Sequence, residues 1–458
     1  MGGFRRGIAL LLLFGNGSPR VLPSMARDYL GPRKPLSGRY ILVTNRTQTW
    51  MGPSQMITHK LKLYLTYQSA YVRIGNGAFR SQNINVVIGV DGQTINGGQV
   101  EINDNKWHEI GGSFRIENQP TKVMVYVQGP DIGVDFMVSE LQIFPVDRQL
   151  RFRHLKEQTD KVRKHDVVLK FATSDPGSLA GTFVKIEQTQ NSFPFGTCVN
   201  SSHLTHKEFL DFFSKNFNWA VFENELKWYW TEPEQGSFNY KDADDLMNLC
   251  TTHNIQLRGH CIFSEVQSWV RTLNNNDMKS AVQNHLRSLL TRYKEQGAPV
   301  GGIGIQGHMD SPIGHIVCST LDKLGTLGLP IWFTEIDVSS NNEYVRADDL
   351  EVMLREAFAH PAVDGVMLWG FWELFMSRDN AHLVNAEGDV NEAGKRYLAL
   401  KEEWLSHAQG HVNKQDEFEF RGFHGSYEVE IVTLCKKKLG KTFVVDQGEG
   451  PLVISMSF

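Results

Sequence analysis

Reactive side chains recur where short apolar stretches of this sequence end. Glu223 follows the stretch 219–222, His260 lies in the stretch 256–263, and Glu335 lies inside the stretch 330–336. A carboxylate within an apolar strand is costly to bury without a partner or a purpose. Carboxylates and imidazoles of this kind are typical of a site that performs acid–base or nucleophilic chemistry.

Further polar and aromatic residues follow the same stretches, namely Asn224, Lys227, Gln306, His308, Trp369 and Trp372. Each alone has a structural explanation, such as a packed indole, a salt-bridged glutamate or a buried histidine. Parallel strands of a barrel bring their carboxyl ends to one rim, so we expect these residues to meet there. Amides, charges and indoles on one rim suit a hydroxyl-rich ligand such as a carbohydrate, and 10 Trp and 27 Phe agree with that interpretation.

The elements that must position these residues begin at residue 193. Short apolar strands alternate there with helical segments, which predicts a parallel α/β sheet, open or closed. A capping box at Thr205-x-x-Glu208 predicts one helix start, and further helices are expected over 277–296 and 347–359. Six strands are expected, over 193–199, 219–222, 256–263, 301–306, 330–336 and 365–371.

The remainder of the chain is rich in strand patterns. Residues 37–147 contain short alternating stretches separated by Gly, Asn and Pro, which predicts an antiparallel sandwich. Residues 148–170 are polar and basic, which favours a solvated helical connector. After residue 410 the strand-like alternation returns.

Composition excludes several functions. With 458 residues, 41% hydrophobic, the chain is long enough for several domains, and its net charge of −4 argues against nucleic-acid binding. No apolar run reaches the ~18 residues of a membrane span. Five widely spaced cysteines predict neither a zinc site nor a disulfide framework. The glycines of Gly302-x-Gly304-x-x-Gly307 lie inside a strand, so a dinucleotide cofactor is not expected, and no other cofactor or metal is predicted.

The amino terminus leaves two interpretations open. Arg5 and Arg6 precede a short apolar run, which fits a secretory signal or an unstructured end equally well. Asn45-Arg46-Thr47 and Asn200-Ser201-Ser202 are N-glycosylation motifs, which matter only if the chain is secreted.

Five motifs carry a family resemblance. F-x-x-E-N-E-L-K-W, R-G-H-C-I-F, G-I-G-I-Q-G-H, W-F-T-E-I-D-V and L-W-G-F-W resemble glycoside hydrolase family 10, whose members are endo-1,4-β-xylanases with a (β/α)8 barrel. The flanks resemble its plant branch, in which family 22 carbohydrate-binding modules precede the barrel. The stretches 44–50 and 97–101 are similar to that module.

The resemblance implies a retaining mechanism with two glutamates. Glu335 matches the nucleophile. Glu223, Asn224 and Lys227 match residues that hold the glycone sugar, and the surrounding substrate-binding set is His260, Gln306, His308, Trp369 and Trp372. In the module, Trp50 and Tyr126 are candidate sugar platforms, although core packing explains them equally well.

The chain departs from the family pattern at one point. The family's acid/base glutamate lies in an Asn-Glu pair that ends the fourth strand, and no such segment is found where the sequence runs from Lys294 to Glu295. Two βα units are therefore missing, and six strands stand where the barrel has eight. Ser264 also replaces a usual tryptophan, and the module lacks its opening strands before Ser37.

These observations predict a (β/α)8-type barrel without two βα units, preceded by a β sandwich and followed by a short β tail. The expected segments are 1–36, signal-like or unstructured; 37–147, a truncated module; 148–190, a connector; 191–406, the barrel; and 407–458, the β extension. The expected function is an endo-1,4-β-xylanase acting on xylan or a related β-1,4-linked polysaccharide, extracellular or in the cell wall. The alternatives are a non-catalytic xylan-binding protein and an inactive truncated product.

Overall fold

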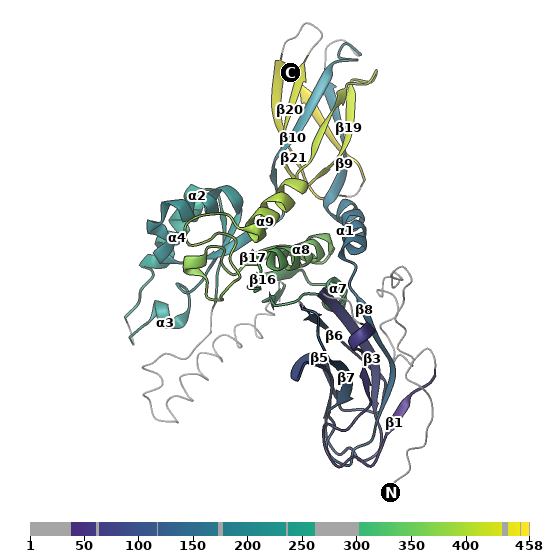
Figure 1. Cartoon of the computed structure of the whole chain (residues 1–458). Coiled ribbons are helices and arrows are strands. Elements are labelled where there is room, and N and C mark those ends of the chain that lie inside the picture. The colour runs from purple at the N-terminus through teal and green to yellow at the C-terminus, as the bar shows by residue number, and fades with distance from the viewer. Residues whose placement is uncertain are drawn as a thin grey trace, which may run out of the picture. The chain divides into compact units, whose positions relative to one another are not determined.

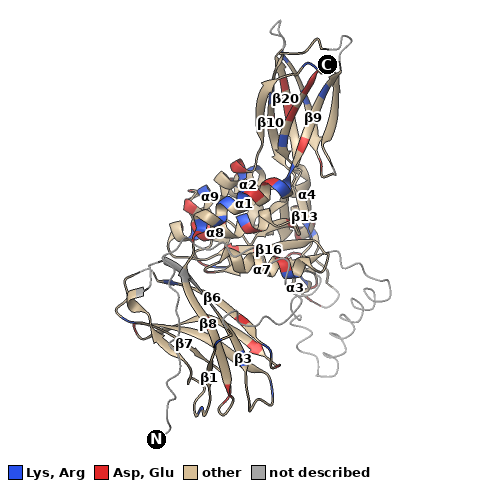
Figure 2. Ribbon diagram, turned by 90° about the vertical axis from the view of Figure 1, so that its right-hand side faces the viewer, with Lys and Arg blue, Asp and Glu red and all other residues tan. Residues whose placement is uncertain are grey.

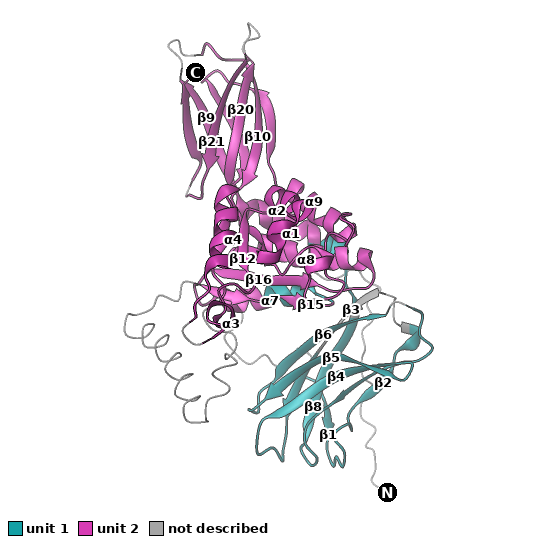
Figure 3. Ribbon diagram, turned by 90° about the vertical axis from the view of Figure 1, so that its left-hand side faces the viewer, with its two compact units in different colours: residues 1–151, 311–319 teal, residues 152–310, 320–458 magenta. Residues whose placement is uncertain are grey.

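A computed structural model describes most of the chain after residue 37: residues 38–60, 64–116, 118–172, 177–234, 237–261, 302–432, 438–448 and 450–457. Two compact units are distinguished, residues 1–151 with 311–319 and residues 152–310 with 320–458 (Figure 3). The signal-like stretch, the helix expected over 277–296 and Ser264 lie outside the described residues.

The first unit contains the predicted antiparallel sandwich. Its two four-stranded sheets have the orders β1-β8-β3-β6 and β2-β7-β4-β5. The strands are β1 (Ile41–Val43), β2 (Ser54–Met56), β3 (Tyr64–Ile74), β4 (Gln82–Val90), β5 (Gln93–Ile102), β6 (His108–Ile116), β7 (Val123–Gln128) and β8 (Phe136–Pro145). Strand β6 was not predicted, because Gly111 and Gly112 interrupt its apolar alternation.

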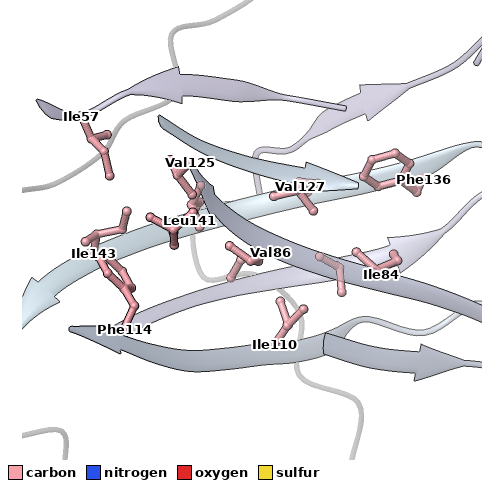
Figure 4. Close-up of a cluster of buried hydrophobic side chains, with 14 of the residues drawn as sticks. Ile57, Ile84, Val86, Ile110, Phe114, Val125, Val127, Phe136, Leu141 and Ile143 are labelled. Atoms are coloured by element: carbon pink, nitrogen blue, oxygen red, sulfur yellow. The ribbon is translucent and has the colours of Figure 1, made fainter. Parts of the chain in front are cut away.

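Alternation along β7 separates the core of this sandwich from its surface. Val123, Val125 and Val127 are fully buried, whereas Met124 and Tyr126 face outward and are partly exposed. Figure 4 shows Val125 and Val127 among the other buried side chains between the sheets. The two-residue period of a strand explains this division.

The second unit is built around a parallel sheet with the strand order β13-β12-β11-β17-β16-β14. Its strands are β11 (Phe195–Val199), β12 (Trp219–Phe222), β13 (Gln256–Arg258), β14 (Ile303–Ile305), β16 (Ile331–Val338) and β17 (Val363–Leu368), and the short β15 (His308–Met309) also pairs with β16. Within the described residues β13 and β14 are the two ends of the sheet. The predicted α/β architecture is confirmed, in the form of a half-barrel.

The helices of the second unit correct some predicted boundaries. Helix α2 (Lys207–Asn216) is N-capped by His206, and the capping box lies at Asn200, before the short helix η3 (Ser201–Thr205). The box predicted at Thr205 is therefore wrong. Helix α8 (Glu343–Ala359) begins four residues before the expected 347, because the Asn342 side chain accepts two backbone N–H bonds there.

The remaining helices complete the α/β layer. Those that lie wholly within the second unit are α3 (Trp228–Thr231), α4 (Lys241–Thr252) and α9 (Glu392–Glu403), whereas the residues of α7 (Gly314–Gly325) are divided between the two units. Figure 2 shows positively and negatively charged residues mixed along α1 (Arg148–Arg163) and α8, and Arg355 of α8 pairs with both Glu351 and Glu403. Among the described residues, no helix is long and apolar enough to cross a membrane.

The segment expected to be a connector, 148–190, is more structured than its composition suggests. It forms helix α1 (Arg148–Arg163) and the strands β9 (Lys164–Ala172) and β10 (Phe183–Asn191). These strands join β18 (His407–His411), β19 (Glu417–Phe423), β20 (Gly425–Val432), β21 (Lys438–Val445) and β22 (Leu452–Ser457) in two further sheets (Figure 1).

This second sandwich has its own core, which includes Val167, Leu169 and Phe171 of β9 and Tyr427 of β20. The charged residues Lys164, Asp166 and Lys170 next to these positions hid the strand pattern in the basic segment. The chain therefore leaves the sandwich after β10, forms the half-barrel, and returns to the same sandwich at β18.

Candidate active site

The predicted site residues lie along the carboxyl edge of the parallel sheet. Each follows the end of a strand: Glu223 after β12, His260 after β13, Gln306 after β14 and Trp369 after β17. Glu335 lies in the second half of β16. Since all the pairings in this sheet are parallel, these ends share one edge.

Glu335 is held in a network of charged groups. It is 8% exposed, and its carboxylate lies 3.1 Å from His308 Nε2. His308 Nδ1 lies 2.7 Å from the carboxylate of Asp337, which is two residues further along β16 and therefore on the same face. One imidazole thus bridges two buried carboxylates and fixes the orientation of Glu335.

Arg378 completes this network, and sequence reasoning missed it. Its guanidinium donates to Asp337 and Asp310 and lies 3.3 Å from the Met309 carbonyl. Arg378 lies in the loop after η4 (Glu373–Phe375), 41 residues from Asp337, and no local pattern marks it. The guanidinium offsets the cost of burying Asp337.

The second group of polar residues surrounds the end of β12. The Asn224 side-chain oxygen accepts from Lys227 Nζ at 3.0 Å and from the Tyr229 hydroxyl at 2.7 Å. Glu223 accepts from Asn200 Nδ2 at 2.7 Å. Sequence reasoning did not identify Asn200 or Tyr229 as part of the site.

Both groups act electrostatically on one buried residue, Cys198. Burial raises the pKa of Glu223, whereas the bond from Asn200 lowers it. Burial also raises the pKa of the Cys198 thiol, and the negative charges of Glu223 and Glu335 raise it further. The two carboxylates therefore act on the same buried thiol.

His260, which follows β13, interacts electrostatically with both the Glu335 network and the polar residues at the end of β12. Its ring makes an edge contact with Trp369, with the ring centroids 5.4 Å apart. Burial lowers the pKa of His260, Glu335 raises it, and Lys227 lowers it. His260 therefore lies near both the glutamate and the lysine, as an imidazole that favours its neutral form.

Gln306 and Trp372, two of the predicted site residues, differ from the others in their surroundings. The Gln306 carbonyl accepts from the Glu335 N–H at 3.0 Å, while its side chain is exposed. Trp372 is only 7% exposed and belongs to a cluster of rings with Phe209 and Phe371. In this structure Trp372 therefore packs in the core and does not line an open surface.

The two candidate platforms of the first sandwich are both accessible. Trp50 is 64% exposed, and Tyr126 is partly exposed on the outer face of β7. The loop that carries Trp50 is fixed by the buried Arg46 guanidinium, which donates to the carbonyls of Thr49 and Met51 at 2.7 and 2.9 Å. Neither ring is fully buried, so packing alone does not account for them.

Comparison with known proteins identifies the family. Two profiles match the chain, one described as "Glycosyl hydrolase family 10" at residues 185–297 and 290–387, and one described as "Carbohydrate binding domain" at residues 32–133. Endo-1,4-beta-xylanase 3 of Arabidopsis thaliana is 54% identical over 529 residues, covering 97% of this chain and 70% of that protein. The chain belongs to glycosyl hydrolase family 10.

Two other family 10 relatives from Arabidopsis thaliana are longer. Endo-1,4-beta-xylanases 1 and 2 are 56% and 51% identical over 97% and 96% of this chain. The chain spans about half of their length, 55% and 49% respectively.

The lengths of these alignments agree with the predicted absence of two βα units from this chain. The alignment with endo-1,4-beta-xylanase 1 runs over 521 residues, which exceeds the 458 residues of the whole chain by 63, so at least that many of its residues have no counterpart here. Two units of a barrel of ~250 residues amount to about 60 residues. The two matches to the family 10 profile also meet around residues 290–297, where the sequence places the gap.

Solved structures of the family were also found. The CBM22-1–GH10 modules of a Clostridium thermocellum endo-1,4-beta-D-xylanase, complexed with xylohexaose, align with 80% of this chain and 91% of their own at 14% identity and a TM-score of 0.39. Xylanase 10B from Thermotoga petrophila, in complex with xylobiose, aligns with 46% of this chain and 94% of its own at 16% identity and a TM-score of 0.37.

Proposed function

We propose that this chain is a family 10 glycosidase directed at xylan, with Glu335 as its retaining nucleophile. The observation that carries the proposal is the buried Glu335 carboxylate held by His308 on the edge that also carries Glu223 and Lys227. A retaining glycosidase needs such a fixed carboxylate to form its covalent glycosyl intermediate. The Asn224 amide and the Lys227 ammonium would bind sugar hydroxyls beside it.

The proton donor is the part of the mechanism that this chain lacks. The Asn-Glu segment of the family has no counterpart between Lys294 and Glu295, and the relatives carry additional residues in their alignments. General acid assistance contributes about 10²–10⁴-fold to such reactions. We therefore propose that the chain cleaves substrates with good leaving groups and turns over polymeric xylan slowly or not at all.

A second candidate is a non-catalytic xylan-binding protein. The exposed Trp50 in a region that matches a carbohydrate-binding profile favours it. In that case the residues along the carboxyl edge of the parallel sheet and the first sandwich bind xylan. The loss of the acid/base segment then has no consequence for function. An inactive shortened product, the third alternative, predicts neither binding nor cleavage.

The proposed substrate indicates where in the organism the chain acts. Xylan is a cell-wall polysaccharide, and endo-1,4-beta-xylanases 1 and 3, which are more than 50% identical to this chain, come from a plant. We propose that the chain acts outside the cell, in plant cell-wall polysaccharide breakdown.

The test uses the full chain and two substrates. A 2,4-dinitrophenyl xylobioside needs no protonation of its leaving group, whereas a xylan chain does. We expect release of dinitrophenol, its loss in Glu335→Gln, and little reducing sugar from xylan. Labelling with an activated 2-fluoroxyloside, followed by peptide mass mapping, should identify Glu335.

Three outcomes separate the alternatives. Rapid xylan hydrolysis that Glu335→Gln abolishes would show that another residue donates the proton. Xylan binding with no cleavage of either substrate would favour the binding protein. Absence of both, in a monomeric folded sample, would favour the inactive product.

A further inference from the structure

The two N-glycosylation motifs have opposite surroundings in the structure. Asn45 is exposed, in a turn with a φ of 54°, a left-handed conformation that asparagine adopts more readily than most residues. Among the described residues, no group forms a hydrogen bond to its side chain. The next residue, Arg46, is 3% exposed and anchors the turn by its bonds to five backbone carbonyls. Asn45 therefore projects from a fixed surface turn.

Asn200, in contrast, forms hydrogen bonds with both the oxygen and the nitrogen of its side-chain amide. Its side-chain oxygen accepts from the Ser202 N–H at 3.0 Å and from the Ser202 hydroxyl at 2.6 Å. The backbone N–H can only donate, so the orientation of the amide is determined and Nδ2 faces Glu223. Nδ2 donates to the Glu223 carboxylate at 2.7 Å, and Asn200 itself is only partly exposed.

The position of the Asn200 side chain is fixed from the backbone as well. The Asn200 N–H donates to His203 Nδ1 at 3.2 Å, and the buried Glu225 accepts from the Ser201 N–H at 2.7 Å. These bonds leave Asn200 little freedom to turn its amide toward solvent. The amide nitrogen that a glycan would need is thus committed to the candidate active site.

We propose that Asn45 carries an N-linked glycan, whereas Asn200 remains unmodified and acts as a positioning residue for Glu223. In the transfer, the amide Nδ2 forms a bond to the anomeric carbon of a lipid-linked oligosaccharyl diphosphate. The bond from that carbon to the diphosphate oxygen breaks, the lipid diphosphate leaves, and the amide loses one proton. At Asn200 the same bond would place a sugar ring where the Glu223 carboxylate lies.

The role of Asn200 rests on the proposed function, since it matters only if Glu223 binds sugar. The modification of Asn45 does not depend on it, because it concerns a surface turn of the first sandwich. The two parts are therefore measured separately.

The first measurement maps glycans on the unaltered chain. The full chain is secreted from a eukaryotic host, its monomeric fraction is isolated, and its mass is compared before and after peptide N-glycosidase treatment. We expect one glycan, at Asn45. Asn45→Gln should abolish it, and the matched control Ser202→Ala, which destroys the second motif but retains Asn200, should leave the mass of the glycan unchanged.

A glycan at Asn200 in the monomeric fraction, or an unmodified Asn45, would overturn the assignment. Neither result depends on whether a variant folds, because both are read from the unaltered chain. The mapping is also independent of any enzymatic activity.

The second measurement tests the positioning role. Asn200→Asp keeps the shape of the side chain and replaces the Nδ2 donor by an oxygen that faces the Glu223 carboxylate. We expect at least tenfold weaker binding of xylohexaose in calorimetry, and partial recovery in the double variant Asn200→Asp/Glu223→Gln, where an amide again faces a carboxylate. Unchanged binding in Asn200→Asp would refute the positioning role, whereas an unaltered chain without xylohexaose binding would refute the proposed function instead.

Discussion

The contact between helix α1 and the half-barrel provides a sharp test of how this fold is held together. Arg163, the last residue of α1, is 6% exposed and donates to three carbonyls: Phe358 at 2.7 Å, His360 at 2.8 Å and Val363 at 2.5 Å. Two of these carbonyls belong to the end of α8 and one to the start of β17. The guanidinium also lies 4.6 Å from the centre of the Phe193 ring. Arg163 therefore ties the connector to the strand that leads to Trp369.

The expected loss of stability follows from these contacts. Hydrogen bonds to a charged donor contribute about 1.5–3 kcal/mol each, which gives about 4.5–9 kcal/mol for three. Burial opposes this gain, as the lowering of the Arg163 pKa to about 10 indicates. That lowering corresponds to about 3 kcal/mol. Arg163→Ala should therefore destabilise the second unit by about 1.5–6 kcal/mol, a large part of the stability of a typical domain.

The assay is equilibrium urea unfolding of the full chain, followed by far-UV circular dichroism. Arg163→Lys keeps the charge but lacks the planar guanidinium that donates to three carbonyls, and its free energy of unfolding should fall by about 2 kcal/mol. Lys161→Ala, an exposed change in the same helical turn, serves as the control and should lose less than about 0.5 kcal/mol. A loss below about 1 kcal/mol for Arg163→Ala would refute the reasoning.

Two further predictions concern pH and ligand binding. Burial lowers the pKa of His203 to about 3, so between pH 6.5 and 3 the unfolded chain binds more protons, and stability should fall by about 2.3 kcal/mol from pH 6.5 to 4.5. Urea unfolding at both pH values should show a smaller loss of unfolding free energy in His203→Gln than in the unaltered chain. An equal dependence of the unfolding free energy on pH in both proteins would contradict the lowered pKa of His203. Trp50→Ala should weaken xylan binding about threefold to tenfold in affinity electrophoresis without changing the unfolding midpoint, because the ring is 64% exposed. Equal migration of the two proteins would exclude Trp50 as a platform.

Much of the fold was predictable because local periodicity determined it. Six strands of the sheet are short apolar stretches, and five of them were placed within three residues, whereas β13 ends at Arg258 and not at the predicted 263. The second sandwich was only half predicted, because β9 and β10 pair with strands more than 200 residues away. A charged segment such as 164–172 acquires a buried face only when those distant strands are present, and single-segment patterns do not contain that information.

The candidate site shows the same limit. Glu335, Glu223 and Asn224 lie in motifs whose spacing is visible along the chain. Arg378 and Asn200 contribute through contacts with residues 41 and 23 positions away, and both lie in loops without a periodic pattern. Their roles follow from which carboxylate they touch, which the sequence does not specify.

The order of the strands is consistent with the proposed loss of the proton donor and the retention of the other site residues. The missing units fall between β13 and β14 in the sequence, and within the described residues these strands are the two ends of the sheet. The pairings of β12 with β11 and of β16 with β17 do not involve the gap. The Glu223 group and the Glu335 network therefore keep their supporting strands, whereas a proton donor carried on the missing strands would have stood between His260 and Gln306. We propose that a deletion at this position would remove proton donation, while the residues proposed to bind sugar and to act as nucleophile keep their supporting strands.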